Sequence, residues 1–237
     1  MDGEAFRQAR WPERSIFEIG GPGRRGHILP RLEEEVRAEV GDVWTLIPEA
    51  LRRVKPPDLP ELSEVAHLEA DILYSVFSED IGHKHWEGMA EKAYEKIKEG
   101  VDGVIFTHGT DTMGYSSAAL SFALQDIPVP IIFVGSQRSS DRPSSDNATN
   151  LIGGVYTAAY APFAEVVVGL HETTSDDSIV YLRGTKVRKC HTSARYAFQP
   201  VNDWPIARYI DERLEMINDR YRPRRQSEPR LLNKFSD

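Results

Sequence analysis

The sequence predicts an α/β fold in which a mostly parallel sheet carries helices on both of its faces. Between about residue 71 and residue 183, short apolar runs alternate with segments of helical periodicity. This alternation is typical of βαβ units, whose strands run parallel. Polar side chains also follow directly after the apolar runs, and open α/β sheets bind ligands at the carboxyl ends of their strands.

The expected elements follow one another with short connections. Residues 85–99 give the clearest helix, because Trp86, Met89, Ala93 and Ile97 recur at helical spacing and a glycine follows at position 100. We further expect strands at residues 71–77, 103–106, 129–135, 165–170 and 178–183, and helices at residues 116–125 and 148–160.

Composition divides the chain into three parts. Residues 1–60 are expected to be irregular, because glycines gather at residues 20–26 and prolines at residues 55–60, with room for a helix or two between them. Residues 61–210 are expected to form the α/β domain, and residues 211–237 a basic, proline-broken tail. Three roles are open for this tail: an RNA contact, a connector between domains, or a solvated linker. Short charge runs are usually solvated, which favours the linker.

Charge and cysteine content narrow the class of protein. Of the 237 residues, 40% are hydrophobic and 28% charged, as in soluble globular proteins. The net charge of -8 argues against broad, nonspecific nucleic-acid binding. The single cysteine, Cys190, excludes an intrachain disulfide and suits a reducing compartment. The start of the chain lacks an apolar signal-peptide core, and no run reaches the roughly 18 apolar residues of a membrane helix. We therefore expect a cytoplasmic protein without membrane contact.

The most informative string is T-H-G-T-D-T-M at residues 107–113, which joins a predicted strand to a predicted helix. Gly109 allows the backbone to turn sharply there. Thr110, Asp111 and Thr112 would then project into a crevice at a helix N-terminus. The alternative is that these three residues only cap the helix, since Thr and Asp are good caps.

This string resembles a signature of the family that contains L-asparaginases and the D subunit of glutamyl-tRNA(Gln) amidotransferase. Three more strings recur in the family's order: F-S-E-D at residues 77–80, V-G-S-Q-R-S-S-D-R-P-S-S-D at 134–146, and R-G-T-K-V-R-K-C-H-T-S at 183–193. The last two resemble the archaeal amidotransferase branch more than the stand-alone asparaginases. The resemblance covers roughly residues 68–207 and implies the N-terminal domain fold of an asparaginase.

The resemblance implies a catalytic Thr–Asp–Lys triad made of Thr110, Asp111 and Lys189. The matched flanks select Lys189 over Lys186, because the family's lysine precedes a hydroxyl pair and an aromatic residue. A threonine hydroxyl is a poor nucleophile until a neighbouring base takes its proton, and a lysine amine can serve as that base. A carboxylate beside the lysine can orient the lysine or hold the α-ammonium group of an amino-acid substrate.

Substrate contacts are implied at the ends of neighbouring strands. Ser78 and Glu79 match the family's pair that holds the α-carboxylate and α-amine, and Gly109, Ser136 and Gln137 border the same crevice. Ser78 and Glu79 could instead form a helix cap with its first-turn acid. Residues 139–146 could likewise be no more than a hydroxyl-rich loop and a cap.

No metal is assigned, because His108, His171 and His191 lack a metal-binding spacing such as H-x-x-x-H.

The chain departs from the family near its N-terminus. Where the family has T-G-G-T-I, whose last threonine is usually the acyl-accepting nucleophile, residues 16–23 read I-F-E-I-G-G-P-G, so that Pro22 takes the nucleophile's position. The mobile loop with the family's catalytic tyrosine is shortened to residues 24–30, and the family's C-terminal domain is expected to be absent. Three interpretations follow: a fragment or damaged product, a degenerate subunit kept for assembly, or an enzyme with Thr110 as its sole nucleophile.

The implied function is hydrolysis of the side-chain amide of glutamine or asparagine. In the amidotransferase branch, ammonia from glutamine converts Glu-tRNA(Gln) to Gln-tRNA(Gln) with a tRNA-binding partner subunit. ATP and Mg²⁺ are implied only for that partner, and we expect no cofactor in this chain, an indirect or weak tRNA contact, and a homo-oligomer. The first alternative is a plain L-asparaginase, and the second is a catalytically dead fragment or assembly module, which Pro22 favours.

Overall fold

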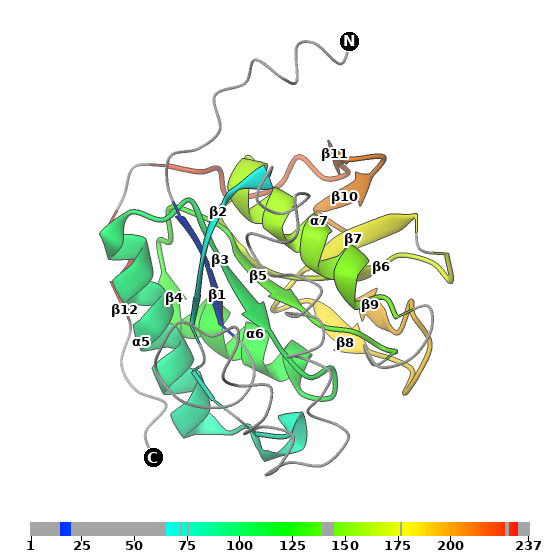
Figure 1. Ribbon diagram of the computed structural model, residues 1–237, viewed down its shortest axis with the longest axis horizontal. Helices are drawn as coiled ribbons and strands as arrows, with labels where there is room; N and C mark the ends of the chain where they lie inside the picture. Colours follow the sequence, from blue (N-terminus) through cyan, green and yellow to red (C-terminus); the bar gives the residue numbers. More distant parts are fainter. Residues whose placement is uncertain are drawn as a thin grey trace, which may run out of the picture.

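The structure is a computed structural model (Figure 1) that describes residues 15–19, 65–71, 73–74, 76–138, 145–175, 177–225 and 228–231. Within these residues, eight strands form one sheet: β1 (Ser15–Ile19), β2 (His67–Asp71), β3 (Gly103–Thr107), β5 (Ile131–Val134), β6 (Val166–His171), β7 (Ser178–Arg183), β10 (Ala207–Ile210) and β11 (Arg213–Met216). Their spatial order is β11-β10-β7-β6-β5-β3-β1-β2. Five neighbouring strands pair in parallel, in the order β2, β1, β3, β5 and β6. Strands β7, β10 and β11 extend the sheet beyond β6 with antiparallel pairs.

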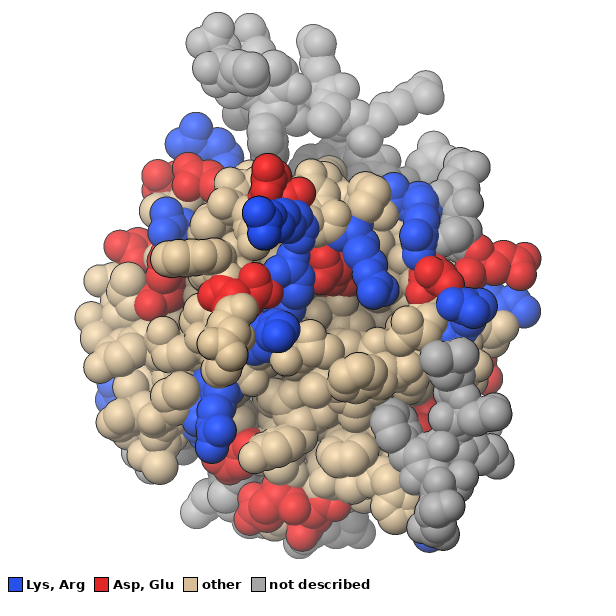
Figure 2. Space-filling view, turned by 180° about the vertical axis from the view of Figure 1, so that it is seen from behind, with Lys and Arg blue, Asp and Glu red and all other residues tan. Residues whose placement is uncertain are grey.

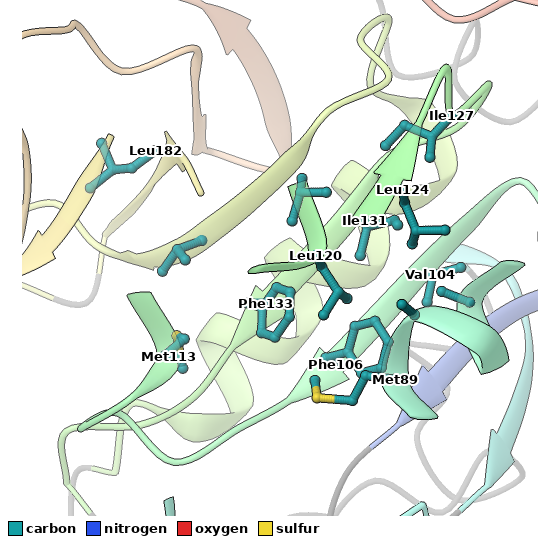
Figure 3. Close-up of a cluster of buried hydrophobic side chains, with 14 of the residues drawn as sticks. Met89, Val104, Phe106, Met113, Leu120, Leu124, Ile127, Ile131, Phe133 and Leu182 are labelled. Carbon is teal, nitrogen blue, oxygen red and sulfur yellow. The ribbon is translucent and has the colours of Figure 1, made fainter. Parts of the chain in front are cut away.

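Helices cover both faces of this sheet, as Figure 1 shows. Helices α5 (His83–Glu99) and α6 (Met113–Ala123) pack on one face, and α7 (Asn147–Tyr160) packs on the other. Because successive strand residues point to opposite faces, Phe106 and Phe133 face α5 and α6, while Ile105 and Ile132 face α7. The rings of Phe106 and Phe133 stack with centroids 5.1 Å apart in the core drawn in Figure 3. The predicted fold class is confirmed.

Among the described residues, two short strand pairs and one helical turn lie outside the main sheet. The short strand β4 (Leu124–Gln125) pairs with β12 (Arg230–Leu231). Strands β8 (Val187–Lys189) and β9 (Phe198–Pro200) form an antiparallel hairpin outside the main sheet. A single 3-10 turn, η1 (Ser78–Asp80), precedes α5.

The strand predicted at residues 71–77 was wrong. The strand there is β2, which ends at Asp71, where its parallel partner β1 also ends at Ile19. Apolar side chains after Asp71, on which the predicted strand was based, pack in the core instead. Leu73 and Tyr74 pack against the core beneath α5, and the Tyr74 ring lies edge-on to His85 with centroids 4.9 Å apart. An apolar run by itself does not distinguish these two environments.

The other predicted elements between residues 85 and 183 are observed, with ends that shift by up to three residues. Helix α5 begins two residues earlier than expected and ends at Glu99. Gly100 adopts a left-handed conformation with φ of 97°, as a helix-terminating glycine should. The predicted helix at residues 116–125 begins at Met113 and ends at Ala123, because the next two residues form β4.

The main sheet also takes strands from outside residues 61–210. Strand β1 comes from the segment expected to be irregular, and β11 comes from the expected tail. The tail residue Arg224 is also fixed to the domain, because its guanidinium donates hydrogen bonds to carbonyl oxygens at the end of α7. Both segments therefore supply parts of the same α/β unit.

Some predictions concern residues outside the described part of the chain. These are the glycine-rich loop at residues 20–26 with Pro22, the shortened loop at residues 24–30, and the helices considered between residues 30 and 50. Of the helices that the structure does describe, not one combines the length and the apolar character needed to cross a bilayer.

Candidate active site

The sheet topology predicts a crevice at the carboxyl ends of β1 and β3. The chain continues from β1 to β2 on one side, whereas β3 is followed by β5 on the other side, so the strand order reverses at this point. Ligands of open α/β sheets bind at such a reversal. Residues 108–112, which connect β3 to α6, lie there.

Thr110, Asp111 and Lys189 meet at this crevice. The Lys189 Nζ donates to Thr110 Oγ1 over 2.7 Å and to Asp111 Oδ1 over 2.8 Å. The lysine arrives from β8 of the outer hairpin, which packs against α6. Its side chain is only 15% exposed, whereas that of Asp111 is 64% exposed, so the amine is largely shielded and the carboxylate faces solvent. The proximity expected from the sequence is observed, and the catalytic roles of these residues remain predictions.

Ser78 and Gly109 join the same cluster. The Thr112 hydroxyl donates to the Ser78 carbonyl oxygen over 2.5 Å. A Cβ atom at position 109 would lie 2.6 Å from Ser78 Cβ, so only glycine allows the β3–α6 loop to approach η1 this closely. Thr112 precedes α6 but makes no side-chain cap with it. Its hydroxyl therefore ties two loops of the crevice together, and helix capping does not explain its side chain.

Two predicted substrate residues stay apart from the triad. Glu79 is exposed on η1, and Ser136 is half-buried after β5. Neither side chain forms a hydrogen bond with the triad residues. Both lie at the same edge of the sheet, because η1 and the loop after β5 border the crevice.

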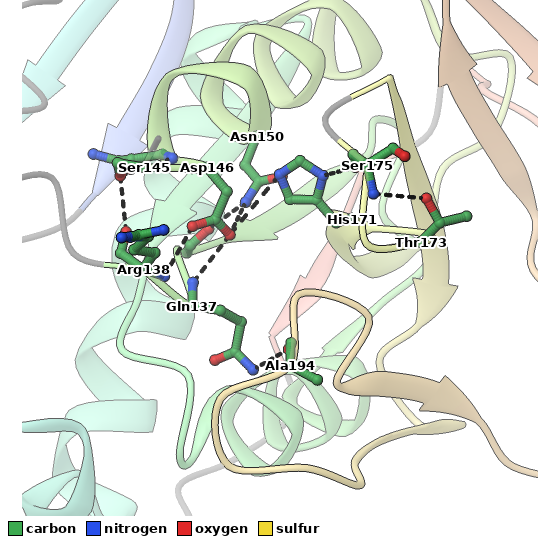
Figure 4. A network of polar contacts seen from close by, with 11 residues as sticks. Gln137, Arg138, Ser145, Asp146, Asn150, His171, Thr173, Ser175 and Ala194 are labelled. Atoms are coloured by element: carbon green, nitrogen blue, oxygen red, sulfur yellow. Dashed lines mark hydrogen bonds and ion pairs between the residues drawn. The ribbon is translucent and has the colours of Figure 1, made fainter. Parts of the chain in front are cut away.

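Gln137 connects the loop after β5 to the hairpin that carries Lys189, as Figure 4 shows. Its side-chain Nε2 donates to the Ala194 carbonyl oxygen over 2.8 Å. Its backbone N–H donates to Asp146 Oδ2 over 3.0 Å. Gln137 therefore contacts protein groups with both its side chain and its backbone.

Asp146, Asn150 and His171 form a buried polar cluster behind Gln137 (Figure 4). Sequence reasoning missed this cluster. An aspartate directly before a helix is typical of an N-cap, and Asp146 is the residue before α7, but its side chain makes no cap bond with that helix. No sequence signal shows that the carboxylate binds backbone N–H groups of the loop after β5 instead of those of the helix. The Asn150 side chain, four residues further on, is the only local hint, since residues i and i+4 are neighbours on a helix.

His108 lies under the site as a neutral side chain. Burial lowers the pKa of His108 to about 4, which outweighs the opposing effect of the hydrogen bond to Gly109. The Nδ1–H donates to the Gly109 carbonyl oxygen over 2.6 Å, since a carbonyl can only accept. The ring also packs edge-on against Phe133 with centroids 5.7 Å apart.

The arrangement can activate a hydroxyl and stabilise negative charge. A neutral lysine amine at hydrogen-bond distance can take the proton of a threonine hydroxyl and return it to a leaving group. Asp111 fixes the position of Lys189 by accepting a hydrogen bond from its Nζ. Helix α6 begins directly after Thr110–Thr112, and the N-terminus of a helix favours negative charge nearby. Among the described residues, no group of three or more His, Cys, Asp or Glu residues could hold a metal ion.

Comparisons with known proteins identify the class of this chain. Residues 49–222 match the family described as asparaginase, N-terminal. The chain is 47% identical over 195 residues to the D subunit of glutamyl-tRNA(Gln) amidotransferase from Sulfolobus acidocaldarius, which covers 79% of this chain and 44% of that protein. For the protein of the same name from Saccharolobus solfataricus, identity is 48% over 165 residues, or 69% of this chain and 37% of that protein. The chain therefore belongs to the asparaginase family, and it spans less than half the length of these relatives.

Solved structures support the fold. The thermostable L-asparaginase from Thermococcus kodakarensis superposes with a TM-score of 0.65 and 23% identity, covering 91% of this chain and 59% of that one. A probable cytoplasmic L-asparaginase from Campylobacter jejuni gives a TM-score of 0.65 and 20% identity, covering 86% and 56%. At these identities the likeness establishes the shared fold and carries no statement about substrate.

Proposed function

We propose that this chain carries the glutaminase centre of a glutamyl-tRNA(Gln) amidotransferase, as its D subunit. The observation that carries the proposal is the contact of Lys189 Nζ with Thr110 Oγ1 and Asp111 Oδ1, at 2.7 and 2.8 Å. The name shared by relatives at 47% and 48% identity supports glutamine as the amide and Glu-tRNA(Gln) as the destination of the ammonia.

In the proposed reaction, Lys189 takes the proton of the Thr110 hydroxyl, whose oxygen adds to the carboxamide carbon of glutamine. The proton then passes to the leaving nitrogen, ammonia departs, and water hydrolyses the resulting ester to glutamate. Ser78 and Glu79 are proposed to hold the α-carboxylate and α-amine of the substrate. The ATP- and Mg²⁺-dependent activation of Glu-tRNA(Gln) is assigned to a tRNA-binding partner subunit.

Pro22 limits the rate expected of the isolated chain. The parallel strand β1 ends at Ile19 beside Phe106 of β3, and therefore at the same sheet edge as Thr110. Residue 22 follows three positions later, outside the described residues, and a proline there has no hydroxyl to attack a substrate. Only Thr110 is then left to attack the substrate, and loss of one catalytic hydroxyl typically removes several orders of magnitude in rate. We expect fewer than about one turnover per second, below the ~10 per second of a typical enzyme.

The test is ammonia release from L-glutamine and from L-asparagine, measured for the chain alone and with the tRNA-binding partner subunit. Four variants are compared: Thr110→Val, Lys189→Met, Pro22→Thr and the control Lys186→Met. Lys186 is an exposed lysine of the same segment without a place in the triad, so its loss should leave the rate unchanged. Pro22→Thr should raise glutamine hydrolysis by about 100-fold or more, and adding Lys189→Met should abolish that gain.

Three outcomes would overturn the proposal. Faster hydrolysis of asparagine than of glutamine would favour a plain L-asparaginase. Absence of hydrolysis by the Pro22→Thr variant, together with absence of glutamine binding by calorimetry at millimolar concentration, would favour an assembly module. Equal losses in Lys186→Met and Lys189→Met would remove Lys189 from its assigned role.

A further inference from the structure

We propose that Asp146 is a positioning residue for this site: its carboxylate fixes the loop after β5 so that Gln137 braces the hairpin and holds the Lys189 amine against Thr110 and Asp111. The inference rests on the proposed function, because it concerns the same triad. It also gives the Gln137 side chain a bracing role in place of a substrate contact.

The first step is the burial of the Asp146 carboxylate, whose side chain is 0% exposed. Its Oδ1 accepts from the backbone N–H of Arg138 over 2.9 Å, and its Oδ2 accepts from that of Gln137 over 3.0 Å. A buried carboxylate is tolerated only when hydrogen bonds replace its lost hydration. The geometry of two successive backbone N–H groups is therefore tied to the position of Asp146.

The second step is the support that Asp146 receives from neighbouring elements. Asn150 on α7 donates from Nδ2 to Asp146 Oδ2 over 3.1 Å and to the Gly135 carbonyl oxygen over 2.8 Å. On the other side, His171 Nε2 lies 3.9 Å from Asp146 Oδ2, while the ring Nδ1–H donates to the Ser175 carbonyl oxygen over 2.9 Å. Asn150 at the start of α7 thus holds the carboxylate by a hydrogen bond, and the His171 ring at the end of β6 lies beside it.

The third step is the bridge from this loop to the hairpin. The Ala194 carbonyl oxygen accepts both from Gln137 Nε2 and, over 3.0 Å, from the backbone N–H of Ala197. The backbone N–H of Ala194 donates to His191 Nδ1 over 2.9 Å. Cys190, the residue after Lys189, closes the hairpin by donating its backbone N–H to the Ala197 carbonyl oxygen over 2.7 Å. The position of Ala194 is therefore coupled, through a hydrogen-bonded turn, to the position of Cys190, the residue next to Lys189.

The hairpin needs such a brace because it lies outside the main sheet. Within the part of the chain that the structure describes, β8 and β9 pair only with each other, and their register places Lys189 opposite Phe198. Phe198 is 2% exposed and anchors β9 in the core. The turn beyond it, residues 190–196, is mostly exposed. Since misplacement of a catalytic group by about 1 Å can cost about 100-fold in rate, a brace at this turn bears directly on the triad.

The experiment measures the reactivity of the Lys189 amine and does not require hydrolysis. Trace labelling with acetic anhydride, read by mass spectrometry, compares Lys189 with the exposed Lys186 of the same chain as an internal reference. Gln137→Leu removes the brace, and Asp146→Asn replaces the carboxylate that fixes the loop. Both should raise the Lys189 to Lys186 labelling ratio at least threefold, because the released amine spends less time on Thr110 and Asp111.

The matched control is Gln125→Leu. Gln125 donates from Nε2 to the Ser121 and Phe122 carbonyl oxygens, each over 3.0 Å, so this substitution also removes side-chain-to-backbone bonds, but at the far end of α6. The control should leave the labelling ratio unchanged. A thermal melt of each variant ensures that labelling is read well below its unfolding temperature.

Gln137→Leu decides the question, because its side chain is only half-buried and its loss should not unfold the chain. An unchanged labelling ratio in a folded Gln137→Leu variant overturns the proposal, whatever Asp146→Asn does. Where hydrolysis is measurable, a brace predicts about a tenfold fall in kcat with little change in KM. A rise in KM alone would instead make Gln137 a substrate contact and would overturn the bracing role. If the Pro22→Thr variant neither hydrolyses nor binds glutamine, the proposed function fails while the labelling result still tests the brace.

Discussion

At the scale of single residues, His108 links the site to the stability of the chain. It is 7% exposed, and its burial between β3 and the crevice lowers its pKa from 6.5 to about 4. Between these two values the imidazole is neutral in the folded chain and protonated in the unfolded chain. The unfolded state then binds more protons, so the free energy of unfolding must fall as the pH is lowered through this window.

We expect His108→Asn to flatten this pH dependence. At about 1.4 kcal/mol per pKa unit, lowering the pH from about 6.5 to about 4 removes about 3 kcal/mol of stability through His108. An asparagine amide can keep the bond to the Gly109 carbonyl oxygen but does not titrate. The measurement is urea unfolding near pH 7 and near pH 4.5 for both proteins. His171, whose pKa is also lowered by burial, should leave a residual slope in the variant. An identical fall in stability for both proteins would contradict the assignment to His108.

The sequence predicted that Thr110, Asp111 and Lys189 would meet, but not which residues surround them. Thr110 and Asp111 stand in one contiguous string, and Lys189 stands in a second string whose flanks match the same family. No comparable sequence string singles out Asp146 and His171, because their roles depend on burial and on contacts between distant elements. An aspartate before a helix predicts a cap, and only the folded chain shows its carboxylate bound to Gln137 and Arg138.

At the scale of elements, the close approach of β3 and β5 brings their carboxyl ends together at the site. The backbone N–H of His108, directly after β3, donates to the Val134 carbonyl oxygen of β5 over 2.9 Å. Gly135 follows β5 and lies against the loop that carries Thr110. A Cβ added at position 135 would lie 2.5 Å from the His108 carbonyl oxygen and 2.6 Å from Met113 Cε.

Gly135→Ala should therefore separate the two strand ends and destabilise the chain. Met113 can move its flexible end, but the His108 carbonyl belongs to the backbone, and overpacking of this kind costs about 1–3 kcal/mol. The matched control is Gly82→Ala, since no atom lies within 4 Å of a Cβ at that position and its φ is -137°. Urea unfolding should show a change of less than about 0.5 kcal/mol for the control. Equal changes in the free energy of unfolding for the two substitutions would show that the backbone at His108 can move aside without destabilising the chain.

Element prediction succeeded where periodicity and burial agree. Strand β3 is apolar and buried, and α5 has a regular apolar face that ends at a left-handed glycine, so local sequence and tertiary packing give the same answer. Prediction failed at β2, because the run after Asp71 is apolar for packing under α5 and not for sheet formation. Strands β10 and β11 were missed because each has only four residues, with charged side chains among the apolar ones. The pairing of β10 with β7 is decided by a partner distant in sequence.

At the scale of the whole molecule, the described part of the chain exposes large apolar side chains. Tyr115 and Phe122 stand two turns apart on α6 and are 67% and 66% exposed, and Trp204 is 75% exposed. Phe122 also lines a groove of about 760 Å³ whose walls include Tyr221. Figure 2 shows a face of the molecule on which uncharged side chains cover a broad area beside a band of Lys and Arg. Apolar surface of this kind commonly marks a contact with another protein.

We expect the purified chain to associate through the exposed face of α6, and Phe122→Lys to weaken that association. Burying roughly 100 Å² of an aromatic ring contributes about 2.5 kcal/mol at 25 cal/mol per Å², or between tenfold and 100-fold in an association constant. A lysine at position 122 loses this contribution and adds a charge that must be desolvated on contact. The measurement is multi-angle light scattering over a range of micromolar concentrations, with Glu95→Lys as the control. Glu95 is exposed on α5, and its replacement also introduces a lysine but changes the net charge by more. An effect of net charge on association would therefore be larger in this control. A monodisperse monomer with a sharp thermal melt would contradict the expected association, and an equal loss of association in both variants would assign it to net charge and not to the α6 face.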